Sequence, residues 1–248
     1  MAEDRVNLPG EAMSSWILAP AEIDAGRAAK HALVAEARRL ILAVTLLDVS
    51  QADPAETEAV ASALASVTGQ VSALPRMPAG PAEAGGPDAR LLERSGISGA
   101  SNPLAAPLRL WLDGDRVRGA AEYGYQYEGP PGCVHGGFVA AAFDDLLGTA
   151  QTLSGTAGFT GTLTIRMVRP MPVNRQIDYE AGFTSLEGRK IKVWARASHA
   201  DETVAEADGV FITPRGGLAD DRMARARAGV NLPAEFTTDS AGSPGPAG

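Results

Sequence analysis

Cysteine and histidine are scarce in this chain, which narrows the chemistry that it can carry. Cys133 is the one cysteine among 248 residues, so no disulfide can form within the chain and a multi-cysteine metal site is excluded. The three histidines, His31, His135 and His199, are far apart in sequence, and no HExxH pattern is present. The sequence therefore predicts neither a metal nor a redox cofactor.

Positive charge and long apolar runs are lacking as well. The chain has 22 Lys and Arg against 30 Asp and Glu, a net charge of −8, whereas a general nucleic-acid-binding protein needs a basic face. The most apolar early stretch, residues 40–47, is much shorter than the roughly 20 residues that span a bilayer, and the charged N-terminus lacks an apolar signal core. We expect a soluble cytoplasmic protein that binds neither nucleic acid nor membrane.

Hydrophobic patterning divides the chain into four regions. Residues 1–75 contain two stretches with apolar residues at helical spacing, and these predict an N-terminal helical extension. Residues 76–100 are rich in Pro, Gly and Ala, which is typical of a linker. Residues 101–213 predict the folded domain, and the polar tail over residues 214–248 is predicted to be disordered.

Within the predicted domain, strand patterns surround one long helix. Residues 108–125 predict a β-hairpin, and residues 135–154 predict the helix. Four further strands are predicted over residues 159–168, 175–186, 189–199 and 203–213. An antiparallel sheet needs a cover for its apolar face, and the single apolar helix can provide it. This order of elements predicts an α+β hotdog fold, an antiparallel sheet wrapped around one long central helix.

The start of that helix carries a pattern that points to chemistry. Gly136 and Gly137 have no side chains, so another group can approach their backbone closely. The first N–H groups of a helix have no intrahelical partner and lie at its positive end. A carbonyl oxygen bound there would be polarised, and the oxyanion formed on attack would be stabilised more strongly. Taken alone, the glycine pair is equally compatible with close packing of the helix on a strand.

Two adjacent carboxylates lie farther along the same helix. Asp144 and Asp145 both have small or apolar residues three and four positions away. A carboxylate that is partly removed from water has a raised pKa and is a stronger base. Periodicity does not choose between the two acids, and it also allows both to lie on a solvated face.

Several motifs of the domain occur together in one order. The HGG of residues 135–137, with Asp144 nine residues after the histidine, resembles the motif of hotdog acyl-CoA thioesterases. The similarity is to the phenylacetyl-CoA thioesterase type and to related animal thioesterase superfamily members. TGTLTIRMVRPMP at residues 160–172 resembles the next strand of that family, and EGRK at residues 187–190 resembles a later turn. The resemblance covers roughly residues 100–213.

This resemblance implies a role for each residue of the motif. Gly136 would supply the amide that binds the thioester carbonyl, with His135 positioning the turn and Gly137 contributing to substrate binding. Asp144 would be the general base or nucleophile. Thr160 would orient water or the acid. In the dimer of such folds, the acid and the oxyanion donor come from different protomers.

The resemblance also implies a substrate. We predict that the chain hydrolyses an acyl-CoA, or an acyl group on a carrier protein, to free acid and thiol. Such an enzyme of fatty acid metabolism would act as a homodimer or tetramer. Arg169, Arg189 and Lys190 are candidates for holding the phosphates of coenzyme A, because charge-assisted hydrogen bonds to phosphate are strong. They are equally compatible with solvated strand ends.

One position departs from the family pattern. Some relatives have an Asn or Gln six residues before the histidine, where it helps to hold the substrate or water, and this chain has Gly129. The departure keeps an alternative open: a non-catalytic acyl-CoA-binding hotdog protein with a regulatory or scaffolding role.

Overall fold

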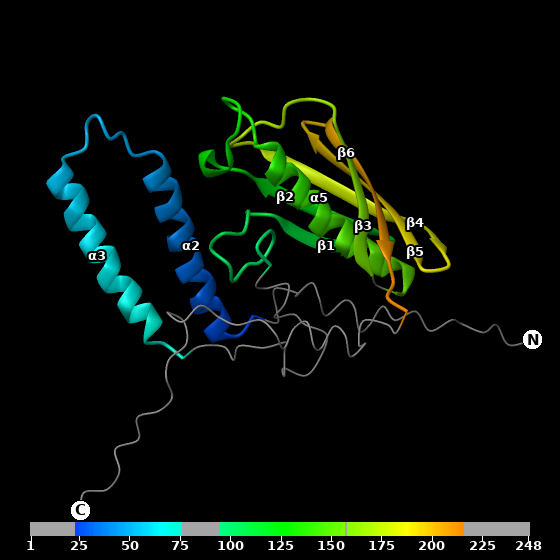
Figure 1. Cartoon of the computed structure of the whole chain (residues 1–248), viewed down its shortest axis with the longest axis horizontal. Coiled ribbons are helices and arrows are strands. Elements are labelled where there is room, and N and C mark those ends of the chain that lie inside the picture. Colours follow the sequence, from blue (N-terminus) through cyan, green and yellow to red (C-terminus); the bar gives the residue numbers. More distant parts are fainter. Residues whose placement is uncertain (1–22, 76–94, 157, 216–248) are drawn as a thin grey trace, which may run out of the picture.

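A computed structural model describes residues 23–75, 95–156 and 158–215 (Figure 1). The predicted tail lies outside the described residues from position 216 onward, and so does most of the predicted linker, from 76 to 94. Both therefore stay predictions.

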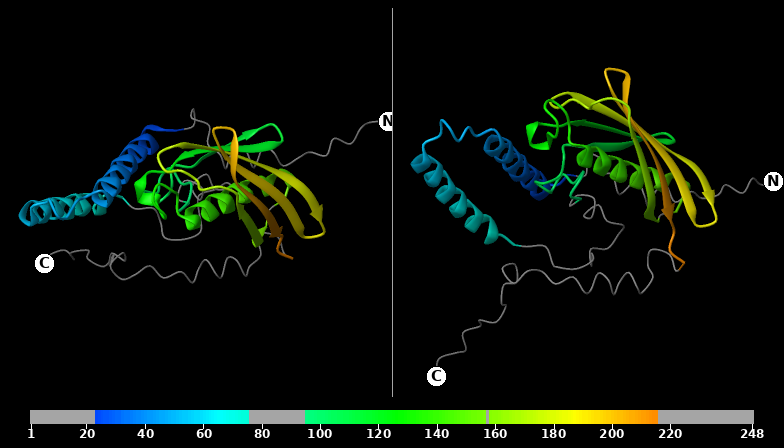
Figure 2. Two further views of the ribbon diagram at one scale, coloured as in Figure 1. Left: turned by 90° about the horizontal axis from the view of Figure 1, so that it is seen from above. Right: turned by 45° about the horizontal axis from the view of Figure 1, so that its top comes forward.

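Two helices make up the described part of the N-terminal extension. Helix α2 (Ala25–Thr45) begins after Asp24, whose carboxylate caps the first turn by accepting a hydrogen bond from the Arg27 backbone N–H. Helix α3 (Pro54–Ser72) begins with a proline, whose fixed φ suits the first helical position. Figures 1 and 2 show α2 between α3 and the rest of the molecule. No helix in the described part of the chain is long and apolar enough to cross a membrane.

Six antiparallel strands form one sheet in the order β1-β2-β4-β5-β6-β3. Their bounds are β1 (Arg109–Asp113), β2 (Arg116–Glu122), β3 (Phe159–Met167), β4 (Gln176–Glu187), β5 (Lys190–His199) and β6 (Glu202–Ile212). The hairpin and the four later strands are confirmed. The second strand ends at Glu122, three residues before the predicted end of the hairpin, because the chain turns there and forms the 3₁₀ helix η2 (Tyr125–Tyr127).

The central helix α5 (Gly136–Ala150) lies along one face of the sheet (Figure 1). It continues into a 3₁₀ turn, η3 (Gln151–Ser154), which ends at Gly155 with φ of 77°. One side of α5 is fully buried against the sheet, with Val139, Ala142, Phe143, Leu146, Leu147 and Ala150 in the core. An antiparallel sheet that wraps around one central helix is the hotdog fold, as the order of elements predicted.

Strand β3 closes one edge of the sheet. It pairs with β6 on one side, and no described strand pairs with its other side. Most of its residues are exposed, including Phe159 and Met167. The register with β6 shifts between Thr160 and Thr162, so a β-bulge lies at Gly161.

Candidate functional site

The first turn of α5 presents one free backbone donor. His135 is the N-cap residue, and its Nδ1 accepts a hydrogen bond from Gly137 N–H at 3.0 Å. The backbone N–H groups of Phe138 and Val139 bond to the His135 carbonyl. The Gly136 N–H has no hydrogen-bond partner among the residues that the structure describes. The donor predicted at Gly136 is therefore available, whereas the Gly137 N–H is taken up by the cap.

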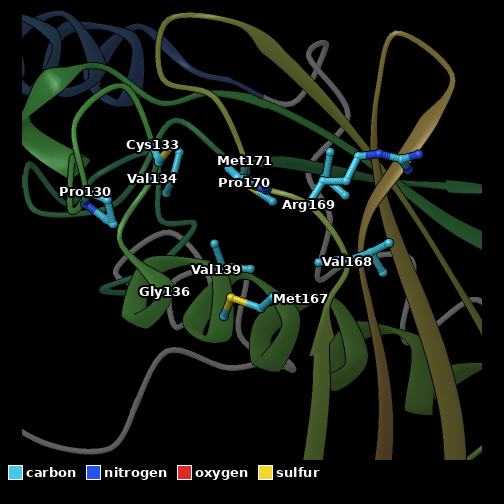
Figure 3. A pocket seen from close by; sticks show the side chains of 12 residues that line it. Pro130, Cys133, Val134, Gly136, Val139, Met167, Val168, Arg169, Pro170 and Met171 are labelled. Atoms are coloured by element: carbon cyan, nitrogen blue, oxygen red, sulfur yellow. The ribbon is translucent and has the colours of Figure 1, made fainter.

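A cavity of about 360 Å³ opens beside Gly136 (Figure 3). Its lining is mainly apolar and comes from the loop before α5, the first turns of α5, the end of β3 with the segment after it, and β6: Pro130, Cys133, Val134, Gly136, Val139, Met167, Val168, Arg169, Pro170, Met171, Val204 and Ala205. Met167 reaches toward α5, and its methyl group lies 3.3 Å from the position where a Cβ on Gly136 would stand. A concave apolar site beside a single polar donor is the usual form of a small-molecule site.

Asp144 lies about two turns farther along α5, on the exposed side of the helix. Its Oδ1 accepts a hydrogen bond from Thr160 Oγ1 at 2.8 Å, so the structure pairs two of the predicted residues. The bulge at Gly161 makes this contact possible. Without it, the two-residue alternation of β3 would put Thr160 on the face opposite to Leu163 and Ile165, which pack against the core.

Asp145, the next residue, has the opposite environment. It is partly buried, and its Oδ2 accepts hydrogen bonds from Ser98 Oγ at 2.6 Å and Ser95 Oγ at 2.9 Å. Burial raises the pKa of the Asp145 carboxyl, although the two serine hydroxyls oppose that rise. In the single chain, the expected desolvated carboxylate is therefore Asp145, whereas the Asp144 side chain is exposed.

Within one chain, the free donor and the exposed acid do not meet. Gly136 and Asp144 are eight residues apart on α5, about 12 Å at 1.5 Å per residue. A thioester bound at Gly136 is therefore out of reach of the Asp144 carboxylate of the same chain.

The structure gives a physical reason for Gly129. A Cβ at this position would lie 2.8 Å from His135 Cα, closer than real Cβ atoms approach, so an Asn or Gln here would displace the turn. The nearby Gln126 does not replace the missing amide. Its Oε1 is buried against Gly124, without a hydrogen-bond partner among the described residues.

The three cations proposed for coenzyme A lie at two ends of the sheet. Arg169 borders the cavity, but its guanidinium points away from it and contacts Glu202 and the Thr203 carbonyl (Figure 3). Arg189 and Lys190 lie at the turn between β4 and β5, where Lys190 stands opposite Ile212. Arg169 N–H donates to the Val204 carbonyl, near the other end of β6. Val204 and Ile212 are eight residues apart, which is about 26 Å along a strand. One chain cannot bring all three to one phosphate.

Sequence comparison finds similarity to curated acyl-coenzyme A thioesterases, although no family model matches the chain. Acyl-coenzyme A thioesterase THEM5 of Homo sapiens is 32% identical over 91 residues, which are 36% of this chain and 37% of that protein. THEM4 of Bos taurus is 34% identical over 87 residues, 34% of this chain and 35% of that protein. The match thus spans little more than a third of these relatives.

Structural comparison gives a wider likeness. The crystal structure of a thioesterase superfamily protein superimposes with a TM-score of 0.65 at 30% sequence identity, over 74% of this chain and 94% of that one. This chain belongs to the thioesterase superfamily. The superimposed share exceeds the part of the chain from residue 95 to 215, so the shared structure of this thioesterase superfamily member extends beyond its hotdog domain.

Sequence reasoning assigns no role to three residues on or beside α5. Ser95 and Ser98, which hold Asp145, fall in the predicted linker because residues 76–100 are rich in Pro, Gly and Ala. Met167 was taken as part of a strand motif without a role. Its position at the end of β3, on the same face as Ile165, was the available signal that it faces α5.

Proposed function

We propose that this chain is a thioester hydrolase that converts an acyl-CoA to the free acid and coenzyme A. The free Gly136 N–H at the mouth of an apolar cavity carries this proposal. An unpaired amide at the positive end of a helix is suited to the oxyanion of acyl transfer. Similarity to proteins named acyl-coenzyme A thioesterases supports the choice of coenzyme A over a carrier protein as the thiol.

The reaction needs a base as well as an oxyanion donor. In our proposal, a carboxylate takes a proton from water while the water oxygen bonds to the thioester carbon. The carbonyl electrons move to oxygen, where the Gly136 N–H stabilises the negative charge. Collapse of this intermediate breaks the C–S bond, and the leaving thiolate takes up the proton held by the carboxylate. Thr160, which donates to Asp144, would orient that carboxylate.

The base is best supplied by a second copy of the chain. Strand β3 has an unpaired edge and exposed apolar residues in the described chain, which favours pairing with another strand. If β3 pairs antiparallel with its copy, a two-fold axis places the Met167 end of one strand beside the Thr160 end of the other. Asp144 of the partner subunit then approaches Gly136, which removes the separation of about 12 Å.

The same arrangement gives a place for the coenzyme A phosphates. Antiparallel pairing brings the Arg169 end of one chain toward the end that carries the partner's Arg189 and the partner's Lys190. These side chains are exposed in the single chain. Charge-assisted bonds from such a cluster suit phosphate groups. The apolar cavity beside Gly136 then remains for the acyl group.

A variant that lacks the backbone N–H of residue 136 tests the oxyanion donor. Gly136→Pro eliminates the N–H at the first helical position, where proline is well tolerated, and His135 already has the extended ψ of 133° that precedes proline. Gly136→Ala is the matched control, because it adds a Cβ yet keeps the N–H. Thiol release from a series of acyl-CoA chain lengths should fall by about 10²–10³ in kcat for the proline variant. Equal rates for the two variants would contradict the assignment.

Shared sites between subunits can be tested by complementation. A chain with Gly136→Pro and a chain with Asp144→Asn should each be nearly inactive. After mixing and subunit exchange, a mixed dimer would hold one site with both residues intact. An equal mixture should then recover about a quarter of wild-type activity, because half of the dimers are mixed and each has one working site. No recovery in a mixture shown to contain mixed dimers would place both groups in one chain.

The non-catalytic alternative makes a different prediction in the same assay. Gly129 leaves the turn without the amide that some relatives have, which favours this alternative. Such a protein would bind acyl-CoA tightly, measured by calorimetry, and release no thiol at any chain length. Thiol release that depends on Asp144 would exclude it.

A further inference from the structure

The N-terminal extension contacts the segment that leads into the turn presenting Gly136, although none of its described residues line the cavity. Helix α2 packs beside η2, the short helix that leads into this turn. Figure 2 shows α2 against this end of the domain, with α3 farther out. Any effect of the extension on the site must therefore be transmitted through η2 and its neighbours, because its described residues do not line the cavity.

Arg38 of α2 makes the polar part of this contact. Its Nη2 donates to the Asn102 carbonyl at 2.8 Å and to the Gly99 carbonyl at 2.9 Å. The guanidinium is partly buried, and its Nε is buried with no hydrogen-bond partner among the described residues. Arg39, the next residue, is instead exposed and pairs with Glu36 on the same helix. A partly buried guanidinium on two carbonyls fixes the segment 95–105, which we name the strap.

The strap connects α2 to the turn through Tyr127. The Tyr127 hydroxyl donates to the carbonyl of Ala105, at the end of the strap, at 3.0 Å. Burial raises the pKa of the Tyr127 phenol, and the positive charge of Arg38 opposes this rise, which places the two side chains in one electrostatic environment. Arg38 and Tyr127 thus hold the same strap from two sides.

Tyr127 in turn holds the oxyanion turn at two points. Its carbonyl accepts a hydrogen bond from His135 N–H at 2.9 Å, directly before Gly136. Its ring packs edge-to-face on Phe138, in the first turn of α5, with 5.0 Å between centroids. A shift of Tyr127 therefore moves both the N-cap and the first turn, and with them the direction of the Gly136 N–H.

We propose that Arg38 is a positioning residue, which acts through the strap and Tyr127 to aim the Gly136 N–H at the thioester carbonyl. The extension would then support catalysis without touching the substrate. This inference rests on the proposed function for its kinetic consequences, but its structural core concerns only the orientation of one amide.

Kinetics of Arg38→Met and Arg39→Met on the full chain test the inference. Loss of Arg38 should lower kcat by about 10-fold, less than the roughly 10² that a displacement of 1 Å can cost, with KM changed by less than about twofold. Arg38→Lys, which keeps a donor for one carbonyl, should restore part of kcat. Arg39→Met should match the wild type. A loss of kcat in Arg38→Met that only follows a lower folded fraction, without partial rescue by lysine, would overturn the proposal.

A second variant tests the route. Tyr127→Phe keeps the ring and the carbonyl and removes the hydroxyl, with its bond to the Ala105 carbonyl and its hydrogen bond with the Gln126 side chain. If Arg38 acts through Tyr127, the double variant should lose little more kcat than Arg38→Met alone. Multiplied losses in the double variant would show that the two residues act separately and would contradict the route.

A readout independent of turnover separates this inference from the proposed function. The backbone amide resonances of Gly136 and Gly137 should shift in Arg38→Met and stay unchanged in Arg39→Met. If they shift while the wild type hydrolyses no thioester, the proposed function fails and the positioning by Arg38 stands. If they do not shift, the inference fails whatever the activity.

Discussion

Asp144 and Asp145 are adjacent on one helix, carry the same functional group and have opposite environments. Asp144 is exposed and accepts one hydrogen bond, from Thr160 on the edge strand. Asp145 is partly buried and accepts bonds from Ser95 and Ser98. A helical step of about 100° is enough to turn one carboxylate toward the edge of the sheet and the other toward the strap. If Asp144 is the base, as we propose, the comparison teaches that a raised pKa by itself does not identify the reactive acid.

The sharpest way to break this comparison is to remove each charge. Asp144→Asn should lower kcat by about 10²–10⁴, the usual contribution of a general base, while its melting temperature stays near that of the wild type because the side chain is exposed. Asp145→Asn should change kcat by less than about threefold, since Asn keeps an oxygen that can accept from both serines. Thiol-release assays measure kcat of both variants, and thermal unfolding measures their melting temperatures. A larger loss in Asp145→Asn would exchange the two roles.

Removing the Thr160 hydroxyl tests whether the proposed base, Asp144, must be oriented by a hydrogen bond in order to act. Thr160→Val keeps the shape and removes the donor to Asp144, which should lower kcat by about 10- to 150-fold, in line with the roughly 1.5–3 kcal/mol of a hydrogen bond to a charged group. Thr164→Val makes the same change at another exposed position of β3 and serves as the control. Equal rates for the two variants would mean that the 2.8 Å contact does not orient the base.

Asp145 should matter for stability. Asp145→Ala leaves the hydroxyls of Ser95 and Ser98 without their acceptor, which should cost about 1–3 kcal/mol in the free energy of unfolding. Urea unfolding measures this loss. Ser98→Ala, which removes one of the two bonds, should lose less. If Asp145→Ala unfolds at the same urea concentration as the wild type, these bonds contribute nothing to the fold.

The order of the helix and strands and the pair of Thr160 with Asp144 could both be predicted from the sequence, but from different kinds of evidence. Strands and helix followed from alternation and helical periodicity, which are local properties. The bond from Thr160 to Asp144 did not follow from periodicity, because the bulge at Gly161 reverses the alternation of β3, and a resemblance to relatives was needed to find it.

What could not be predicted depends on contacts between distant segments. The serines that hold Asp145 lie 47 and 50 residues away from it in a Gly- and Ser-rich stretch, and Arg38 bonds to carbonyls more than 60 residues away. No local pattern encodes such bonds. Periodicity gave both acids similar neighbours and left the choice between them open, so Asp144 could be selected only through the resemblance to a family.

The smallest expected effect concerns pH. Because burial raises the pKa of Asp145 in the folded chain above its value of 3.8 in the unfolded chain, folding favours the protonated form. At a pH below 3.8 both states are protonated and the residue adds no penalty. As the pH rises through 3.8, the unfolded chain ionises first, and stability falls until the pH exceeds the folded pKa. Asp145→Asn has no such charge, so the difference in free energy of unfolding, wild type minus variant, should decrease as the pH rises from 3 and level off once the pH exceeds the folded pKa. Urea unfolding of both proteins across this range measures the difference, and an increase with pH would show that the serine bonds outweigh the burial of the carboxylate.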